Sequence, residues 1–254
     1  FCNTRSIIGE TIHQEVGGSM VADSTLLDGE DPDQVGMMDE MCILVDIDDL
    51  PIGAASKLDC HRGAGLRHRA FSVLIFDGED RLLLQKRASD KITFPGVWAN
   101  SCCSHPLDIN GEKETDDASG VKNAAVRKME QELGIPAGKI PADNLHLITR
   151  MEYMARMNDV WVEHEIDHIM VVRADVEVSP NPNEIEDFRW VSKDELSSMA
   201  DEHDAGKLVI APWFDLIRVN FLNDWWEDID DMSKHVDNAI HRFVEERPDR
   251  AGLS

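Results

Sequence analysis

The 254-residue sequence is poor in cysteine and basic residues, and it has no long apolar run. Five cysteines, an odd number in a chain far longer than a disulfide-stapled mini-domain, argue for a reducing intracellular setting. No apolar run reaches the roughly 18 residues of a transmembrane helix. Only 25 basic residues face 50 acidic ones, and the net charge of −25 would repel nucleic acid and anionic membrane surfaces. An anionic small substrate would therefore need a metal ion and a local basic cluster.

Residues 1–36 show no sustained hydrophobic periodicity and contain one basic residue, Arg5, which is poor support for an attached transit peptide. We expect a flexible acidic N-terminal extension over residues 1–36 and a single domain over residues 37–254. Because the sequence begins at Phe1 rather than Met, we also expect a fragment or a processed form.

The rest of the chain alternates patterns typical of strands and helices. Short apolar or alternating runs predict strands over residues 41–45, 71–76, 81–87, 145–155, 161–173 and 185–191, with residues 71–87 forming a hairpin about a glycine-containing turn. Helices are predicted over residues 118–133, after the capping box at residues 192–195, and from Pro212 to Trp225. This order indicates an α/β (α+β) fold with a mixed β-sheet sandwiched between helices.

The loop over residues 94–106 collects two adjacent thiols, an imidazole and an indole between a strand pattern and a helix pattern. Its Cys-x-His pair, Cys103 and His105, is a candidate for chemistry, because rigid scaffolds commonly present functional groups on loops. The structural alternative is a Gly/Pro turn with buried cysteines, since unpaired cysteine is among the most buried residue types.

A second group lies in the strand predicted over residues 161–173. Side chains alternate across a strand, so Glu163 and Glu165 point to the same side. Two carboxylates at one site need a cation or a shared proton, although a solvated strand face is the simpler alternative in so acidic a chain. Three imidazoles in loop positions are the matching ligands, and with the two carboxylates they would suit Mn²⁺, Zn²⁺ or Fe²⁺, whereas Mg²⁺ prefers oxygen: His61, His68 and His105.

These residues together resemble the type I isopentenyl-diphosphate isomerases, which have the Nudix fold. The resemblance rests on the loop at residues 99–106, the Glu163-His-Glu165 strand and the two earlier histidines, and it covers about residues 37–245. It implies that Cys103 is the catalytic thiol and that Tyr153 and Trp213 belong to the active site, Trp213 facing the reacting carbons. It also implies a divalent metal, Mg²⁺, Mn²⁺ or Zn²⁺, held by five side chains, with Glu165 doubling as acid/base: His61, His68, His105, Glu163 and Glu165.

The resemblance also implies a diphosphate site. The family pattern picks out Lys57, Arg87, Lys91 and Ser104 for the diphosphate, and Glu132 for a Mg²⁺ that bridges to it. Arginine and lysine suit this task on chemical grounds, since guanidinium grips phosphate bidentately and lysine acts as a point charge.

Two other functions compete with the isomerase. A diphosphate-cleaving Nudix hydrolase needs a helix rich in glutamate, but Lys128 and Gln131 stand where two of those glutamates belong. A non-catalytic Nudix-like binding module would be expected to lack the thiol or the ligands, and all of them are present.

The resemblance implies conversion of isopentenyl diphosphate to dimethylallyl diphosphate by a 1,3-proton shift, with Cys103 and the Glu165/Tyr153 group on opposite sides of the substrate. Which group donates and which accepts the proton is left open by the sequence. We expect no flavin or nicotinamide, no nucleic-acid or membrane partner, and a monomer. The expected location is intracellular, in the cytoplasm or alternatively in a plastid or another organelle.

Overall fold

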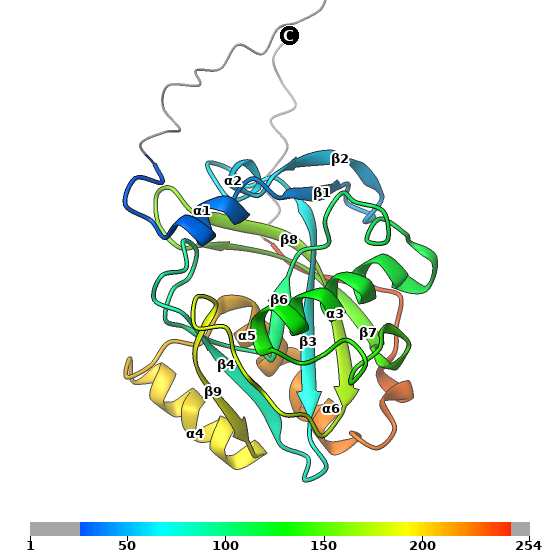
Figure 1. Cartoon of the computed structure of the whole chain (residues 1–254). Helices are drawn as coiled ribbons and strands as arrows, with labels where there is room; N and C mark the ends of the chain where they lie inside the picture. Colours follow the sequence, from blue (N-terminus) through cyan, green and yellow to red (C-terminus); the bar gives the residue numbers. More distant parts are fainter. Residues whose placement is uncertain (1–25, 245–254) are drawn as a thin grey trace, which may run out of the picture. The chain divides into compact units, whose positions relative to one another are not determined.

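The computed structural model describes residues 26–244 (Figure 1). The chain divides into two units, residues 1–30 and 31–254, and the fold below is that of the second. Residues 1–25 of the extension predicted over residues 1–36 lie outside the described residues. Its last part, from Pro32, forms helix α1 (Pro32–Met37) instead, capped by the Asp31 carboxylate, which accepts from the Asp33 amide at 2.9 Å. Gln34 Nε2 donates to Asn183 Oδ1 at 2.7 Å, so this helix is part of the second unit.

The predicted mixed sheet is confirmed in the described residues. Its path runs β10-β7-β8-β3-β1-β2, with β4, β5, β6 and β9 branching from β3 and β4. The strands are β1 (Met41–Val45), β2 (Pro51–Ser56), β3 (His68–Phe76), β4 (Leu82–Arg87), β5 (Trp98–Ala99), β6 (Cys102–Ser104), β7 (His146–Arg156), β8 (Val162–Arg173), β9 (Ile185–Val191) and β10 (Ile240–Phe243). The central pair β3–β8 is parallel, whereas β7–β8 is antiparallel.

The predicted hairpin over residues 71–87 is correct at its turn and wrong in its pairing. Asp77 Oδ1 accepts from the amides of Glu79 and Arg81 at 2.9 and 2.8 Å and so closes the turn. Beyond it, β3 and β4 pair only at Phe76 and Leu82. The strands then separate, because β3 pairs with β8 and β6 while β4 pairs with β9 and β5. Every residue of β3 is buried, so the apolar run indicated a central strand whose partners are distant in sequence.

Helices cover both faces of the sheet, as predicted (Figure 1). The helices are α2 (Lys57–Cys60), α3 (Ser119–Leu133), α4 (Lys193–Asp204), α5 (Pro212–Ile217) and α6 (Asn223–Glu227). On one face, Val121, Ala125 and Met129 of α3 share a core cluster with Val73 and Ile75 of β3. Within the described range, no helix is long and apolar enough to cross a membrane.

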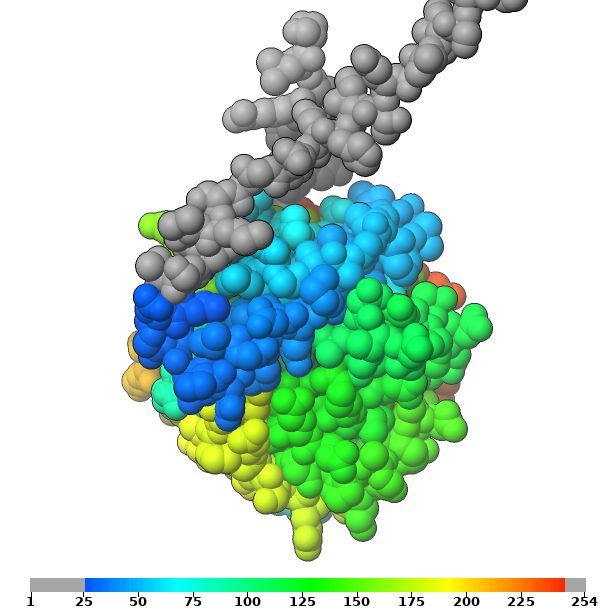
Figure 2. Space-filling model, turned by 45° about the horizontal axis from the view of Figure 1, so that its top comes forward, coloured from blue at the N-terminus to red at the C-terminus, as the bar shows by residue number. Residues whose placement is uncertain are grey.

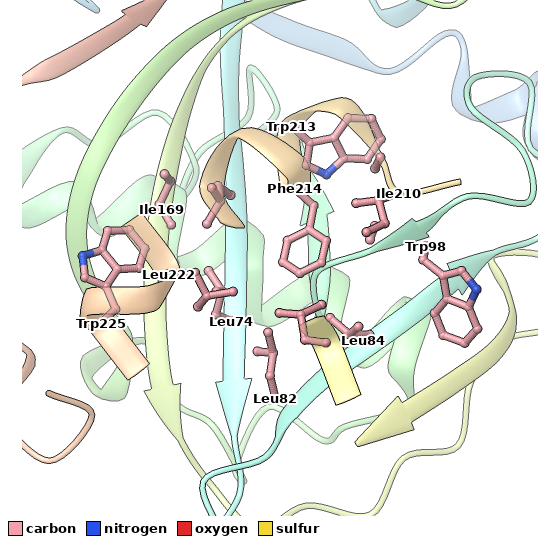
Figure 3. Packing of buried hydrophobic residues seen from close by; sticks show 14 of the residues in the cluster. Leu74, Leu82, Leu84, Trp98, Ile169, Ile210, Trp213, Phe214, Leu222 and Trp225 are labelled. Carbon is pink, nitrogen blue, oxygen red and sulfur yellow. The ribbon is translucent and has the colours of Figure 1, made fainter. Parts of the chain in front are cut away.

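The other face of the sheet is covered by α5 and α6. Phe214, Leu222 and Trp225 share a cluster with Leu74 and Leu84 and lie over these sheet residues (Figure 3). The single helix predicted for residues 212–225 is interrupted, because residues 218–222 form a π-helix between α5 and α6. The sheet thus has two alternating sets of side chains, one packed on α3 and one facing α5.

Gly134 ends α3 in a left-handed conformation with φ of 66°, and a Cβ there would lie 2.4 Å from the Ser179 carbonyl oxygen. We therefore expect Gly134→Ala to lower the free energy of unfolding by more than about 1 kcal/mol, since the left-handed backbone alone costs an L-residue that much. Denaturant unfolding measures the change. Gly138→Ala is the matched control, because a Cβ at Gly138 meets nothing within 4 Å; an equal loss in both variants would contradict the explanation.

Candidate active site

Strand alternation separates the two adjacent thiols. In the antiparallel β3–β6 pair, Cys102 lies opposite Val73 and Cys103 lies opposite Ser72. Cys102 consequently joins the core beneath α3, whereas Cys103 packs on the opposite side and lines a pocket. The predicted catalytic thiol is thus the one that reaches a cavity.

The prediction that Glu163 and Glu165 share one side of their strand is confirmed. Both line the same pocket as Cys103, while His164 between them points away and lies 3.1 Å from Glu152 Oε1. Tyr153 of β7 pairs directly with Glu165, and its hydroxyl donates to Glu165 Oε2 at 2.5 Å and lies 3.1 Å from Glu163 Oε2. Phenol and carboxylates form one hydrogen-bonded group.

The three predicted histidines meet at Glu165. Their candidate ligand atoms and that of Glu165 all lie within 4.8 Å of one another. Backbone carbonyls orient two of the rings: His61 Nδ1 lies 2.8 Å from the Lys57 oxygen, and His68 Nδ1 lies 2.7 Å from the Leu66 oxygen. The opposite Nε2 atoms therefore face Glu165 Oε1 at 3.9 and 3.4 Å, and both are buried without a hydrogen bond to any described residue.

This cluster has the donors of a divalent metal site. Three imidazoles and one carboxylate, with orphaned buried nitrogens and rings held by backbone carbonyls, match the ligands and outer hydrogen bonds of transition-metal centres. Burial lowers the pKa of His105 to about 3 and that of His61 well below its usual range, so both rings are neutral and able to bind a metal. Glu163 is not among the four side chains of this cluster; its carboxylate lies 3.1 Å from the Tyr153 hydroxyl.

The acid and base candidates have strongly shifted pKa values. Burial raises the pKa of Cys103 to about 12, and burial together with the charge of Glu165 raises that of Glu163 to about 8. Burial also opposes ionisation of Glu165, but the hydrogen bond with His105 and the charge of His68 outweigh it and hold the pKa of Glu165 well below its usual range. One pocket is therefore lined by a neutral thiol and by paired carboxyl groups of different proton affinity.

The predicted diphosphate residues line the same pocket: Lys57, Arg87, Lys91 and Ser104. The Arg87 guanidinium donates to the backbone oxygens of Phe94 and Thr93 at 3.0 and 2.8 Å, which fixes it beside the loop. Burial and the nearby Arg87 lower the pKa of Lys91 to about 8, and Lys91 forms an ion pair with the buried Glu184. Arg87, at the end of β4, and Lys91, in the turn after it, thus bring two cations next to the loop over residues 94–106.

Glu132, the predicted Mg²⁺ ligand, reaches the pocket from the last turn of α3. Lys128, one turn earlier, donates to Glu132 Oε1 at 2.9 Å and is itself buried. The Glu132 carboxylate is therefore already paired with the Lys128 ammonium group. A Mg²⁺ at Glu132 would bind beside this ammonium group or displace it.

Trp213 lines the pocket from the start of α5. Its indole Nε1 donates to Asn100 Oδ1 at 3.1 Å, and Phe94 meets its ring edge to face at 5.5 Å between centroids. The Asn100 amide also donates to the Cys102 backbone oxygen at 2.9 Å, so one buried side chain links the indole to the thiol strand. Sequence reasoning missed Asn100, although it lies within the loop that the sequence singles out.

Sequence reasoning also missed part of the pocket wall. Gln34, Met37 and Met38, in and just after helix α1, line the pocket. In the space-filling view, the surface of α1 adjoins that of α3 (Figure 2). Ser72 and Asp167 line the pocket floor; the alternation that singled out Glu163 and Glu165 continues to Asp167 and would have identified it.

Comparison with known proteins shows the family to which the chain belongs. Residues 66–214 match the NUDIX domain. The chain is 46% identical over 218 residues to isopentenyl-diphosphate delta-isomerase 1 of Mesocricetus auratus, covering 84% of this chain and 96% of that protein. It is 46% identical over 219 residues to the isopentenyl-diphosphate delta-isomerase of Schizosaccharomyces pombe, with 84% and 94% covered. For the Candida albicans enzyme of the same name the identity is 43% over 250 residues, with 89% and 87% covered. The chain therefore belongs to the isopentenyl-diphosphate delta-isomerase family and has a Nudix domain.

Proposed function

We propose that this chain converts isopentenyl diphosphate to dimethylallyl diphosphate. The observation that carries the proposal is that one pocket is lined by a thiol from β6, a phenol and two carboxylates from β7 and β8, and three basic side chains. The names of the relatives describe the same reaction. Product identification by NMR, described below, tests it.

The proton shift uses residues on different strands. One group protonates the terminal alkene carbon, which gives a tertiary carbocation, and another removes a proton from the carbon next to the one that bears the diphosphate. Cys103 serves one of these steps, and Glu165 with its Tyr153 hydrogen bond serves the other. Trp213 stabilises the cation through its π face, worth about 2 kcal/mol when desolvated.

A divalent metal fits the cluster of His61, His68, His105 and Glu165, and Glu163 is the fifth ligand in this proposal. When bound, the metal supplies positive charge that stabilises ionised carboxylates at the site. The protein's own part is to hold the imidazole rings through the backbone oxygens of Lys57 and Leu66. Mg²⁺, Mn²⁺ and Zn²⁺ are the candidate ions.

The diphosphate binds at the cationic end of the pocket, to Lys57, Arg87, Lys91 and Ser104, with a Mg²⁺ at Glu132. The support is that all five side chains line one cavity. The proposed reaction needs neither flavin nor nicotinamide, because a proton shift moves the double bond without net oxidation or reduction of the substrate.

A hydrolase is disfavoured by the partners of the helix residues. Lys128, at a position where the hydrolase pattern has glutamate, is paired with Glu132, and Arg127 is paired with Glu112 at 2.6 Å. One carboxylate of the pattern thus remains in α3, and it carries an ammonium partner.

An intracellular, cytoplasmic location and a monomeric state also belong to this proposal. The four cysteines of the described residues are free thiols, which suits a reducing compartment: Cys42, Cys60, Cys102 and Cys103.

Cys103→Ser should lower kcat by about 10² to 10⁴, the range for loss of a general acid or base. Cys102→Ser is the control, because this neighbouring thiol faces α3 and should keep most of the activity. Steady-state kinetics of both variants measure the difference, and equal losses would contradict the assignment of Cys103.

Removing a ligand of the proposed metal should remove the metal. His61→Ala and Glu163→Gln proteins should contain substoichiometric metal by elemental analysis, with activity falling in parallel. His164→Gln serves as the control, since this imidazole lies on the other side of β8 and contacts Glu152. A fully metallated and fully active variant would exclude that residue from the ligand set.

Arg87→Ala should raise KM more than it lowers kcat, because the diphosphate is not cleaved and its contacts persist through the reaction. Lys86→Ala is the control: Lys86 is the preceding residue of β4 and pairs with Glu186 at 2.5 Å, away from the pocket.

Phosphorus and proton NMR should show dimethylallyl diphosphate without phosphate release. Phosphate release without double-bond migration would establish a hydrolase instead.

A further inference from the structure

The face of β8 that carries Glu163 and Glu165 continues to Asp167, a third carboxylate, which the mechanism above does not use. Asp167 is 2% exposed and lines the pocket together with Cys103. Its Oδ2 accepts from the Ser72 hydroxyl at 2.8 Å, and its Oδ1 is buried without a hydrogen-bond partner in the described part of the chain. It is not one of the four side chains of the metal cluster.

A purely structural role does not account for this residue. Burying a carboxylate oxygen without a partner costs stability, whereas an apolar side chain of similar size would be tolerated. The next residue on the same face of β8, Ile169, belongs to the apolar core over which α5 and α6 lie. This face of β3 and β8 therefore changes from apolar to polar at Ser72 and Asp167, which line the pocket.

The strand register aligns this pair with the thiol. Ser72 lies directly opposite Cys103 in the antiparallel β3–β6 pair. Directly opposed residues project to the same side with Cβ atoms about 4.5–5.5 Å apart. Because the hydroxyl hydrogen of Ser72 is donated to Asp167, the lone pairs of its oxygen remain available, and the thiol placed opposite is a weak hydrogen-bond donor.

We propose that Ser72 and Asp167 are positioning residues for Cys103: Asp167 fixes the rotamer of Ser72, and the Ser72 oxygen orients the Cys103 thiol toward the reacting carbons. The inference rests on the proposed function, in which Cys103 exchanges a proton with the substrate. Proton transfer depends steeply on geometry, and a misplacement of about 1 Å can cost about a hundredfold in rate. Ser72 lies opposite the thiol in the strand register and neither residue is one of the proposed diphosphate ligands, so their loss should act on the chemical step rather than on diphosphate binding.

The first test compares Ser72→Ala with Ser72→Thr in the full-length, metal-loaded enzyme. Ser72→Ala should lower kcat about tenfold to a hundredfold with KM within about threefold, and Ser72→Thr, which keeps the hydroxyl, should recover kcat to within about threefold of wild type. Thr149→Ala is the matched control, because Thr149 is a buried hydroxyl bonded to Asp237 at 2.6 Å and lies outside the pocket.

Three results of this comparison would overturn the proposal. They are a Ser72→Ala kcat no lower than that of Thr149→Ala, a loss that appears in KM alone, and a Ser72→Thr enzyme as slow as Ser72→Ala. Wild-type enzyme that forms no dimethylallyl diphosphate would instead refute the proposed function, so the two failures are distinguishable. Thermal unfolding of each variant shows that the compared proteins are folded.

A double-mutant cycle tests the link between the two residues. Asp167→Ala should lower kcat about as much as Ser72→Ala, and the double variant should be no more than about threefold slower than either, because both changes remove one support. Asp167→Asn, whose amide oxygen can still accept from Ser72, should keep kcat within about threefold of wild type. Losses that multiply in the double variant, or an Asp167→Asn enzyme as slow as Asp167→Ala, would contradict the proposed coupling.

Discussion

The buried carboxylate of Glu165 is the constraint on which the rest of the site depends. One of its oxygens lies 2.8 Å from His105 Nε2 and the other accepts from the Tyr153 hydroxyl at 2.5 Å. A buried carboxylate is costly unless charge and hydrogen bonds compensate for it. Three imidazoles and a phenol supply that compensation, from the residue after α2, from β3, from β7 and from the loop after β6. Glu165 thus links the centre of the sheet to the loop that carries Cys103.

Side chains along β3 and β8 alternate between the two faces of the sheet, so one face packs in the core and the other carries the residues of the site. The side of β3 and β8 toward α3 is apolar, with Val73, Ile75 and Met170 in one core cluster. The opposite side carries Leu74 and Ile169 toward α5 and α6, then Ser72 and Asp167, and finally His68 and Glu165 along the two strands. Because the residue period is two, a slip of one residue in the β3–β8 register would exchange the core and the site.

Much of this arrangement could be predicted from local patterns. The strands at residues 145–155, 161–173 and 185–191, the helix that ends at Gly134, the capping box of α4 and the common side of Glu163 and Glu165 are all encoded within short windows. The pairing of β3 with β8 could not be predicted in this way, since its partners lie almost a hundred residues apart and a fully apolar strand has no preferred neighbour in its sequence. The π-helix within residues 212–225 was missed because one extra residue per turn leaves the apolar pattern almost unchanged.

The same limit applies to the site. His61, His68 and His105 have no spacing that marks a metal motif. The parallel β3–β8 pair places His68 opposite Glu165, while His61 follows α2 and His105 follows β6, so only the tertiary fold brings the three together. The resemblance to the isomerase family identified them, because it carries the long-range contacts that a single sequence does not show. Asn100 and Asp167 lay within reach of local reasoning, as a loop residue beside the thiols and as the next position on a functional strand face.

The electrostatics of the pocket follow from its burial in a strongly acidic protein. A net charge of −25 opposes an anionic substrate at long range, but salt limits that repulsion to about 8 Å at physiological ionic strength. Carboxylates hold the buried lysines at and behind the pocket wall: Lys91, which lines the pocket, pairs with Glu184, and Lys128 pairs with the pocket-lining Glu132. These ion pairs lower the cost of burying the two ammonium groups. In the proposed binding mode a diphosphate would compete with Glu184 for Lys91, and Arg87 and a Mg²⁺ ion would supply the remaining positive charge.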